Sequence, residues 1–229
     1  MQARLIESFE IAPEVRHFVF EAPEVSKLDF LPGQFVSFTH SIHEKNITRA
    51  YSIASPPYDG NRFELCLNLV HEGKFSPHLF EMKPGDAVEM RPPLGQFVIR
   101  HPGRAAVLIA TGTGIAPFRS ILRGHLSATS PDFTLLFGVR HEHSLMYRAE
   151  FEDLAGRFEH FRFLPTLTRP TPEWTGRTGR IHAHLKEAIG ERRDLDVFLC
   201  GLKAMVDETR TTLKEMGFDR KQILYEKYD

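Results

Sequence analysis

Two stretches of this sequence carry residue types that bind phosphate groups. The first is Thr111-Gly112-Thr113-Gly114, which follows the apolar run AAVLIA and precedes an amphipathic stretch. A strand that turns directly into a helix presents free backbone N–H groups and the positive end of a helix dipole. Glycines let the backbone turn tightly and approach a ligand. We therefore expect a helix that begins at Ile115 and a turn before it that holds an anion.

The second stretch is Arg49-Ala50-Tyr51-Ser52, a different nucleotide-like signature further upstream. On a strand, Arg49 and Tyr51 would point to one face and Ser52 to the other. Taken alone, the pattern also fits an ordinary barrel strand with a surface Arg and a core Tyr. Two cofactor sites on one chain would indicate electron transfer.

A third motif, Gly73-Lys74-Phe75-Ser76, places a glycine turn before a hydroxyl residue. Ser76 can cap a short helix that runs to Met82, which leaves amide N–H groups facing a pyrophosphate. The same residues would cap a helix in a protein without a ligand. This motif therefore only supports the other two.

The elements that must position these motifs fall into two groups. Before residue 101, short runs rich in β-branched and aromatic residues are separated by Pro and Gly: VRHFVFEA, QFVSFTH, TRAYSIAS, FELCLNLVH, AVEMRPP and QFVIR. This pattern predicts an antiparallel β-barrel or sandwich. After it, expected strands alternate with expected helices. The strands are 105–110, 133–138, 159–165, 195–199 and 222–227, and the helices are 115–127, 147–155, 180–189 and 202–216.

That alternation predicts a doubly wound parallel sheet. A polar stretch over residues 100–104 separates the two groups, so we expect one domain over residues 1–101 and a second over 102–229. A chain of 229 residues is long enough for both.

Composition narrows the function classes. The 29 basic and 30 acidic residues nearly cancel, so we expect neither nucleic acid nor an anionic membrane as a partner. No apolar run reaches the roughly 18 residues of a membrane span, and the first residues lack a signal-peptide core, so we expect a cytoplasmic protein. Two cysteines are too few for a four-cysteine iron–sulfur cluster or a disulfide framework. The two His-X-His pairs, at 141 and 143 and at 182 and 184, lack further ligands at recognisable spacing, so we expect no metal site.

A barrel followed by a parallel nucleotide domain, with RAYS in the first and GTGIAPF in the second, resembles the ferredoxin–NADP reductase superfamily of flavoproteins. The same order continues with GKFS, PLG at 93–95, LLFGV at 135–139, Cys200-Gly201 and the terminal YEKYD. Each of these is a weak motif, whereas the ordered set is specific. The resemblance covers nearly the whole chain. It implies an FAD-dependent oxidoreductase that transfers hydride between NADPH and flavin and exchanges single electrons with a ferredoxin, a flavodoxin or a small-molecule acceptor.

The resemblance also implies roles for individual residues. In the barrel, Arg49 would pair with the phosphates of the flavin cofactor, Tyr51 would lie against the isoalloxazine and Ser52 would reach its reactive N5. In the second domain, the turn from Thr111 to Gly114 would hold the nicotinamide cofactor's pyrophosphate, and Cys200 would lie beside nicotinamide C4. Tyr228 would cover the second flavin face as a gate, with Glu226 as a polar contact or proton partner. The expected catalytic residues are Ser52, Cys200, Glu226 and Tyr228.

Discrimination between NADP and NAD depends on the groups around the adenosine 2′ position, where Arg or hydroxyl donors suit a phosphate. Ser144 stands where NADH-linked relatives tend to carry Asp, and Thr168-Arg169 resembles a Ser-Arg pair that grips the 2′-phosphate. Arg180 departs from the family pattern, which has a Tyr stacked on adenine at that place. Arg140 is a further candidate. We expect NADPH as the nicotinamide cofactor, with NADH as the alternative.

Other functions remain open at this point. The chain could be an NADH-linked reductase component of an oxygenase or a free-flavin reductase. It could also be a nucleotide-binding subunit without turnover, because fold does not determine function. We expect a monomer.

Overall fold

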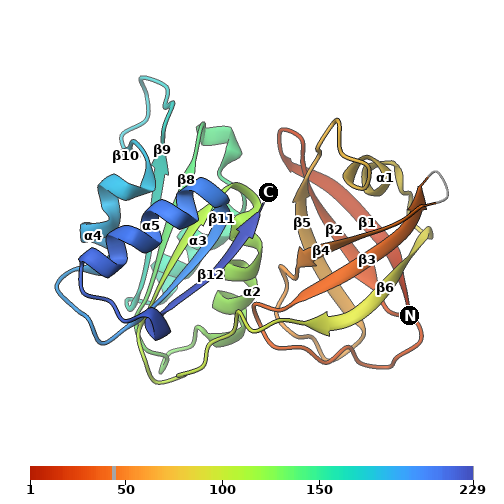
Figure 1. The fold of residues 1–229 in the computed structure, drawn as a ribbon, viewed down its shortest axis with the longest axis horizontal. Helices are drawn as coiled ribbons and strands as arrows, with labels where there is room; N and C mark the ends of the chain where they lie inside the picture. The colour runs from red at the N-terminus through yellow and green to blue at the C-terminus, as the bar shows by residue number, and fades with distance from the viewer. Residues whose placement is uncertain (43–44, 229) are drawn as a thin grey trace. The chain divides into compact units, whose positions relative to one another are not determined.

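The computed structural model describes residues 1–42 and 45–228, which form two compact units. Unit 1 joins Met1–Ile99 with Ala116–Gly124, and unit 2 joins Arg100–Ile115 with the residues from His125 onward. Figure 1 shows the elements of both units along the chain. The domain boundary between residues 101 and 102 stays a prediction. Asp229, the last residue of the terminal motif, lies outside the described residues.

Unit 1 is built on an antiparallel six-stranded sheet with the order β4-β3-β6-β1-β2-β5. Its strands are β1 (Gln2–Ala12), β2 (Val15–Glu21), β3 (Phe35–Ile42), β4 (Lys45–Ser52), β5 (Arg62–Asn68) and β6 (Ala87–Leu94). An isolated antiparallel bridge between Ile53 and Leu65 joins the chain after β4 to β5. Because β4 and β5 are the two edge strands, this bridge closes the sheet into the predicted barrel.

The barrel interior is packed with phenylalanine rings. Phe18, Phe20, Phe38 and Phe63 are all 0% exposed, and the Phe20 ring lies 5.1 Å from Phe38 and 5.7 Å from Phe63. Alternation along each strand sends these side chains inward and polar residues outward. Each buried ring contributes about 1.5–3 kcal/mol to stability, and Phe38 of this layer contacts Tyr51 of the RAYS motif on β4.

One predicted strand of this unit does not form. The QFVIR segment has no regular structure, and its backbone is packed against another turn instead of a strand. An ideal Cβ on Gly33 would lie 2.0 Å from the Phe97 carbonyl oxygen. The Phe97 ring packs on Phe118 at 5.7 Å. Conversely, the sequence patterns did not identify β1, whose apolar alternation is interrupted by charged residues.

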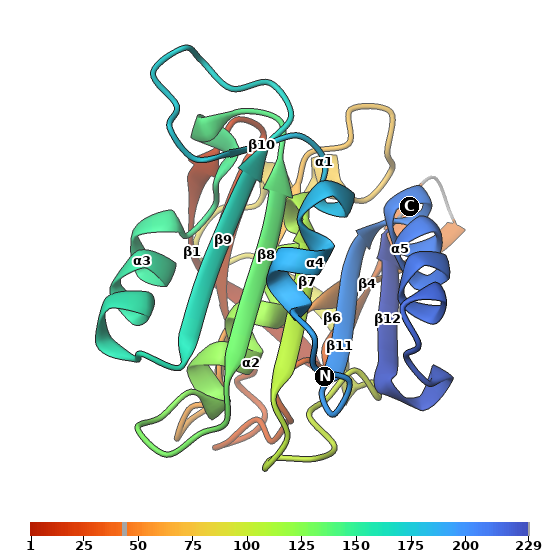
Figure 2. The ribbon, with the colours of Figure 1, turned by 90° about the vertical axis from the view of Figure 1, so that its left-hand side faces the viewer.

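Unit 2 is built on a parallel six-stranded sheet with the order β10-β9-β8-β7-β11-β12, as Figure 2 shows. Its strands are β7 (Ala106–Thr111), β8 (Phe133–Val139), β9 (Phe161–Leu167), β10 (Arg177–Thr178), β11 (Asp196–Leu202) and β12 (Ile223–Tyr228). The helix α2 (Ala116–His125) follows β7 but lies almost wholly in unit 1, and the α-helices described in unit 2 are α3 (Arg148–Arg157), α4 (Leu185–Ile189) and α5 (Lys203–Glu215). The doubly wound parallel sheet is confirmed. Strand order reverses at β7, and the carboxyl ends of strands at such a point are where open sheets bind ligands.

No helix in the described part of the chain has the length and hydropathy of a membrane span.

Candidate functional site

The predicted phosphate turn packs against the end of β11 through backbone atoms. An ideal Cβ on Gly114 would lie 2.3 Å from the carbonyl oxygen of Cys200. Gly201 has a φ of 145°, and a Cβ there would lie 2.2 Å from the Thr111 hydroxyl oxygen. The backbone N–H of Leu202 donates to the same oxygen at 3.4 Å. Two motifs about 90 residues apart in sequence thus meet at the carboxyl edge of adjacent parallel strands.

The turn differs in detail from its prediction. Residues Gly112–Ile115 form a 3-10 turn, and α2 begins at Ala116 instead of Ile115. Gly112 has a φ of 54°, which favours glycine, and no atom lies within 4 Å of its ideal Cβ. Pro117 has no N–H to lose and suits the first turn of a helix. The open space at Gly112 fits the close approach of a phosphate group.

Three of the four predicted catalytic residues lie together at this edge. The register of β12 against β11 pairs Glu226 with Cys200 and Tyr228 with Leu202. Burial raises the pKa of the Cys200 thiol well above its ordinary value, the Glu226 charge raises it further, and a hydrogen bond with Tyr228 opposes these effects. The thiol is therefore protonated at neutral pH and is not a thiolate nucleophile.

In unit 1, the RAYS motif occupies the end of β4. Tyr51 is partly buried, and its ring lies 5.8 Å from Phe38 and 6.0 Å from Phe75. Burial raises the pKa of the Tyr51 hydroxyl, so the ring is neutral. Ser52 is 6% exposed. The exposed Arg49 donates a hydrogen bond to the Thr48 carbonyl at 2.9 Å and makes no ion pair with a described residue.

The GKFS motif adjoins the same ring but uses its serine differently from the prediction. The predicted helix exists as α1 (Ser76–Glu81), yet the residue before it is Phe75, and no side chain caps it. The Ser76 hydroxyl instead accepts a hydrogen bond from the Val70 N–H at 2.9 Å. A turn closed by the Gly73 N–H and the Val70 carbonyl at 2.8 Å brings this partner close. Lys74 is exposed beside the turn. The first amide groups of α1 thus have no side-chain cap, which fits an anionic ligand.

The residues predicted around a 2′-phosphate lie on connected backbone at the carboxyl ends of β8 and β9. The Arg169 N–H donates to the Arg140 carbonyl at 2.8 Å, and the Thr168 N–H donates to Val139 at 3.1 Å. The Ser144 N–H donates to His141 at 3.0 Å. Arg140, Thr168, Arg169 and Arg180 are exposed. The guanidinium groups of Arg140 and Arg169 make no ion pair with any residue that the structure describes.

Sequence reasoning missed a buried ion pair in unit 1. Arg119 of α2 is 7% exposed and donates to a Glu64 carboxylate oxygen at 2.5 Å and to the Ala54 carbonyl at 3.0 Å. The Tyr58 hydroxyl donates to the other Glu64 oxygen at 2.6 Å. The only signal in sequence was one arginine inside the apolar stretch GIAPFRSIL. Because charges are rarely buried without a partner, such an arginine indicates a buried carboxylate elsewhere in the fold.

The contacts of this network shift the pKa values of Glu64 and His17. Burial alone would raise the pKa of the Glu64 carboxyl, but hydrogen bonds from Tyr58 and Arg119 outweigh it and lower the pKa. His17 lies 3.7 Å from Glu64 and is 5% exposed. Burial lowers its pKa from 6.5 to about 4; the Glu64 charge opposes this shift, while Arg119 and Arg123 reinforce it.

The buried His17 predicts acid sensitivity. Because its pKa is lower in the folded state, the unfolded chain takes up the proton first as the pH falls from 6.5 to about 4. Stability is therefore complete above pH 6.5 and decreases below it, by about 2–3 kcal/mol at pH 4.5. We expect His17→Gln to flatten this pH dependence of the unfolding free energy in urea, whereas the exposed His71→Gln leaves it unchanged. Identical slopes for the wild type and His17→Gln would contradict the prediction.

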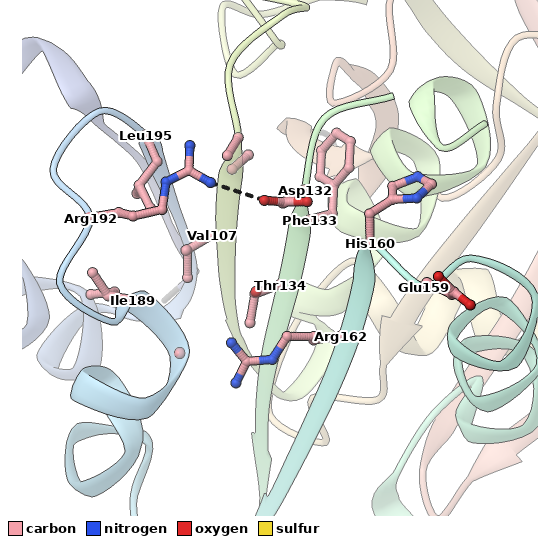
Figure 3. Close-up of a pocket in the computed structure, with 13 residues that line it drawn as sticks. Val107, Asp132, Phe133, Thr134, Glu159, His160, Arg162, Ile189, Arg192 and Leu195 are labelled. Carbon is pink, nitrogen blue, oxygen red and sulfur yellow. Dashed lines mark hydrogen bonds and ion pairs between the residues drawn. The ribbon is translucent and has the colours of Figure 1, made fainter. Parts of the chain in front are cut away.

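A cavity of about 260 Å³ opens at the opposite, amino-terminal edge of the parallel sheet. Figure 3 shows Val107, Thr134 and Arg162 at the starts of β7, β8 and β9 around it. An ion pair of 2.9 Å between Arg192 and Asp132 lies at its rim. None of the predicted site residues lines this cavity. No group of three or more potential metal ligands occurs among the described residues.

Family models of known proteins match the two parts of the chain separately, with the RAYS and GKFS motifs in one match and the phosphate turn in the other. Residues 2–99 match the family model of the oxidoreductase FAD-binding domain, and residues 108–211 match that of the oxidoreductase NAD-binding domain. Ferredoxin–NADP reductase B of Sorangium cellulosum is 37% identical over 238 residues, which cover 100% of this chain and 97% of that protein.

Two further similarities are informative. The anthranilate 1,2-dioxygenase electron transfer component of Acinetobacter baylyi is 31% identical over 89% of this chain, which spans only 60% of that protein. The crystal structure of a ferredoxin NADP⁺ reductase from Neisseria gonorrhoeae with bound FAD and NADP has a TM-score of 0.85 and 26% identity. That likeness covers 99% of this chain and 98% of the other.

Proposed function

Because the chain belongs to the ferredoxin–NADP reductase superfamily of FAD-dependent oxidoreductases, we propose that it exchanges electrons between NADPH and a separate ferredoxin or flavodoxin. The observation that carries the proposal is the backbone packing of the phosphate turn against Cys200 and Gly201, with Glu226 in register beside them. A fold alone hosts many functions, whereas this constellation combines the groups that a nicotinamide site needs.

FAD would be held by unit 1. Arg49, which has no carboxylate partner among the described residues, would pair with phosphate. The neutral Tyr51 ring would lie against the isoalloxazine, and the Ser52 hydroxyl would bond to it. The uncapped start of α1, with Gly73 and Lys74 before it, would face the pyrophosphate. When bound, the flavin supplies two-electron chemistry toward nicotinamide and one-electron chemistry toward the acceptor.

The nicotinamide cofactor would be held by the turn from Thr111 to Gly114. A protonated Cys200 thiol offers the nicotinamide a small neutral surface, so no thiolate is present to add to the electron-poor ring of the oxidised nicotinamide. Glu226 would supply a nearby carboxylate for a polar contact or a proton. Tyr228, which hydrogen-bonds to Cys200, is the proposed gate over the flavin.

NADPH is the proposed nicotinamide cofactor because cationic and hydroxyl groups predominate at the adenosine end. Within the described residues, the guanidinium groups of Arg140 and Arg169 make no ion pair. Thr168 and Ser144 add hydroxyls, and Arg180 adds a further cation. Glu142, the carboxylate next to this group, is neutralised by an ion pair with Arg148.

The physiological partner and the assembly state follow from the same proposal. The two cysteines of this chain are free thiols and cannot supply the four ligands of an iron–sulfur cluster, so the proposed electron acceptor is a separate ferredoxin, flavodoxin or small molecule. Free thiols also fit a reducing compartment, and we propose a cytoplasmic monomer. Similarity to an oxygenase electron transfer component favours one second candidate, an NADH-linked reductase for an oxygenase.

The Arg169→Ala variant tests the proposed function. A charged hydrogen bond to a phosphate is worth about 1.5–3 kcal/mol, so kcat/KM for NADPH should fall about 10- to 100-fold. The value for NADH should not change, because NADH has no 2′-phosphate. The measurement is bleaching of the flavin absorbance by each nicotinamide, followed by transfer to ferredoxin, flavodoxin or ferricyanide. A wild type that prefers NADH would reject NADPH and favour the oxygenase candidate.

A further inference from the structure

The loop after β9 leaves the parallel sheet and returns to the strand it left. β10 pairs with β9 through Arg177 beside Thr166 and Thr178 beside Leu167. The Thr166 hydroxyl donates to the Gly179 carbonyl at 2.9 Å, and the Gly179 N–H donates to Leu167 at 2.8 Å. The two ends of the loop are therefore held together. Its first residues, Thr168 and Arg169, and the residue after its end, Arg180, share one edge of the sheet.

The far part of this loop is organised around Trp174. Its indole N–H donates to the Arg177 carbonyl at 2.9 Å, and its backbone N–H donates to Thr171 at 3.1 Å. An ideal Cβ on Gly176 would lie 2.3 Å from the indole ring. Only glycine at that position lets the ring lie against its own loop.

One side chain joins this loop to two other segments. The Arg148 guanidinium, at the start of α3, lies 5.4 Å from the centre of the Trp174 ring. Its Nε donates to Glu152 of α3 at 2.6 Å. Its terminal nitrogen donates to Glu142, in the short turn that also contains Ser144. Arg148 therefore connects the segment of Ser144 with the loop of Thr168 and Arg169.

The two segments held in this way both carry positively charged side chains. Arg140 and Arg169 are joined by a backbone hydrogen bond, and neither has a carboxylate partner among the described residues. Two cationic residues on hydrogen-bonded backbone favour an anionic ligand at this place. If binding has to order a loop, part of the binding free energy is lost to the entropy of that ordering. A loop that is already ordered therefore binds the same ligand more tightly.

We propose that Arg148 and Trp174 are positioning residues for the adenosine 2′-phosphate of NADPH. They hold the Ser144 turn and the Arg169 loop in one arrangement before the cofactor arrives. The proposal rests on the proposed function, because it assigns a role at the same nicotinamide site. A purely structural role fits less well, since the side chains of Arg148, Glu142 and Glu152 are 38%, 41% and 51% exposed, and exposed ion pairs add little to global stability.

The test uses the flavin-loaded protein and two fragments of the cofactor, 2′,5′-ADP and 5′-AMP, with binding measured by calorimetry. Arg148→Met should weaken 2′,5′-ADP about five- to tenfold and 5′-AMP less than about twofold. Trp174→Leu should act in the same direction, and Arg148→Lys should restore part of the affinity. In parallel, KM should rise for NADPH and not for NADH, with kcat unchanged.

Arg157→Met is the matched control at the other end of α3. Arg157 also pairs with a carboxylate four residues away, Asp153 at 3.3 Å, and lies 5.4 Å from the Phe158 ring. It should change neither fragment's affinity. Equal weakening of both fragments by Arg148→Met, or no weakening, would overturn the proposal. A wild type that binds both fragments equally would instead reject NADPH as the cofactor, which separates the two failures.

Discussion

Replacing Gly114 by alanine is expected to slow flavin reduction by NADPH about a hundredfold while FAD stays bound. The new Cβ would lie 2.3 Å from the Cys200 carbonyl oxygen, 2.6 Å from its carbon and 2.8 Å from the Gly201 nitrogen. All three are backbone atoms of a strand buried within the sheet, so no side chain can move aside. The turn or the end of β11 must shift, and a misplacement of about 1 Å at a reacting centre costs about a hundredfold in rate.

Two other glycines provide matched controls for Gly114→Ala. Gly156→Ala in α3 introduces a methyl group with no atom within 4 Å and should leave the rate unchanged. Gly112→Ala meets open space but has a φ of 54°, so it tests strain of about 1–2 kcal/mol without a collision. The measurement is stopped-flow flavin absorbance at saturating and limiting NADPH. A Gly114→Ala rate equal to that of Gly156→Ala would refute the close-packed turn as the nicotinamide site.

The parallel sheet was the most predictable part of the fold because two independent signals agree there. Its strands are short apolar runs, and a helix-length stretch separates most neighbours. The strand expected at 105–110 is found at Ala106–Thr111, and the one expected at 222–227 is found at Ile223–Tyr228. Once the strands are parallel, their carboxyl ends must share one edge. This is why Thr111 and Cys200 could be placed together from sequence.

Local backbone detail was less predictable because it depends on tertiary contacts. Ser76 has a residue type suited to helix capping, but the Val70 N–H competes for its hydroxyl, and the helix starts without a side-chain cap. The QFVIR segment has strand composition, yet its backbone packs on the turn at Gly33. In both places a partner distant from the local pattern decides the conformation.

The Arg119–Glu64 pair was unpredictable for a related reason. Its members come from α2 and β5, and no local spacing links them. An arginine inside an apolar helix segment indicates that a buried partner exists but does not identify it. Another member of the network, His17, comes from β2 and adds no recognisable motif.

Arg119→Met should lower the free energy of unfolding by about 3–5 kcal/mol, a large fraction of the total stability of a typical protein. Methionine matches the length of the arginine stem, so packing is largely kept. The loss comes from the Glu64 carboxylate, whose side chain is 14% exposed and loses its nearest cation, and from the Ala54 carbonyl, which loses a donor. The measurement is urea unfolding of the flavin-loaded protein at pH 7.

The double variant Arg119→Met with Glu64→Gln distinguishes two contributions to the lost stability. One is the missing attraction between Arg119 and Glu64, and the other is the cost of leaving the Glu64 carboxylate without its partner. When both charges are removed, no unpaired carboxylate stays buried, so the double variant should be more stable than Arg119→Met alone. Arg123→Met is the matched control, because its guanidinium is 4.0 Å from the same Glu64 oxygen but 34% exposed, and it should cost less than about 1 kcal/mol. If the double variant were no more stable than Arg119→Met, then Glu64 would not be the group that makes Arg119 indispensable. The cost would then lie in the lost bond to Ala54, which ties α2 to the chain just beyond the RAYS motif.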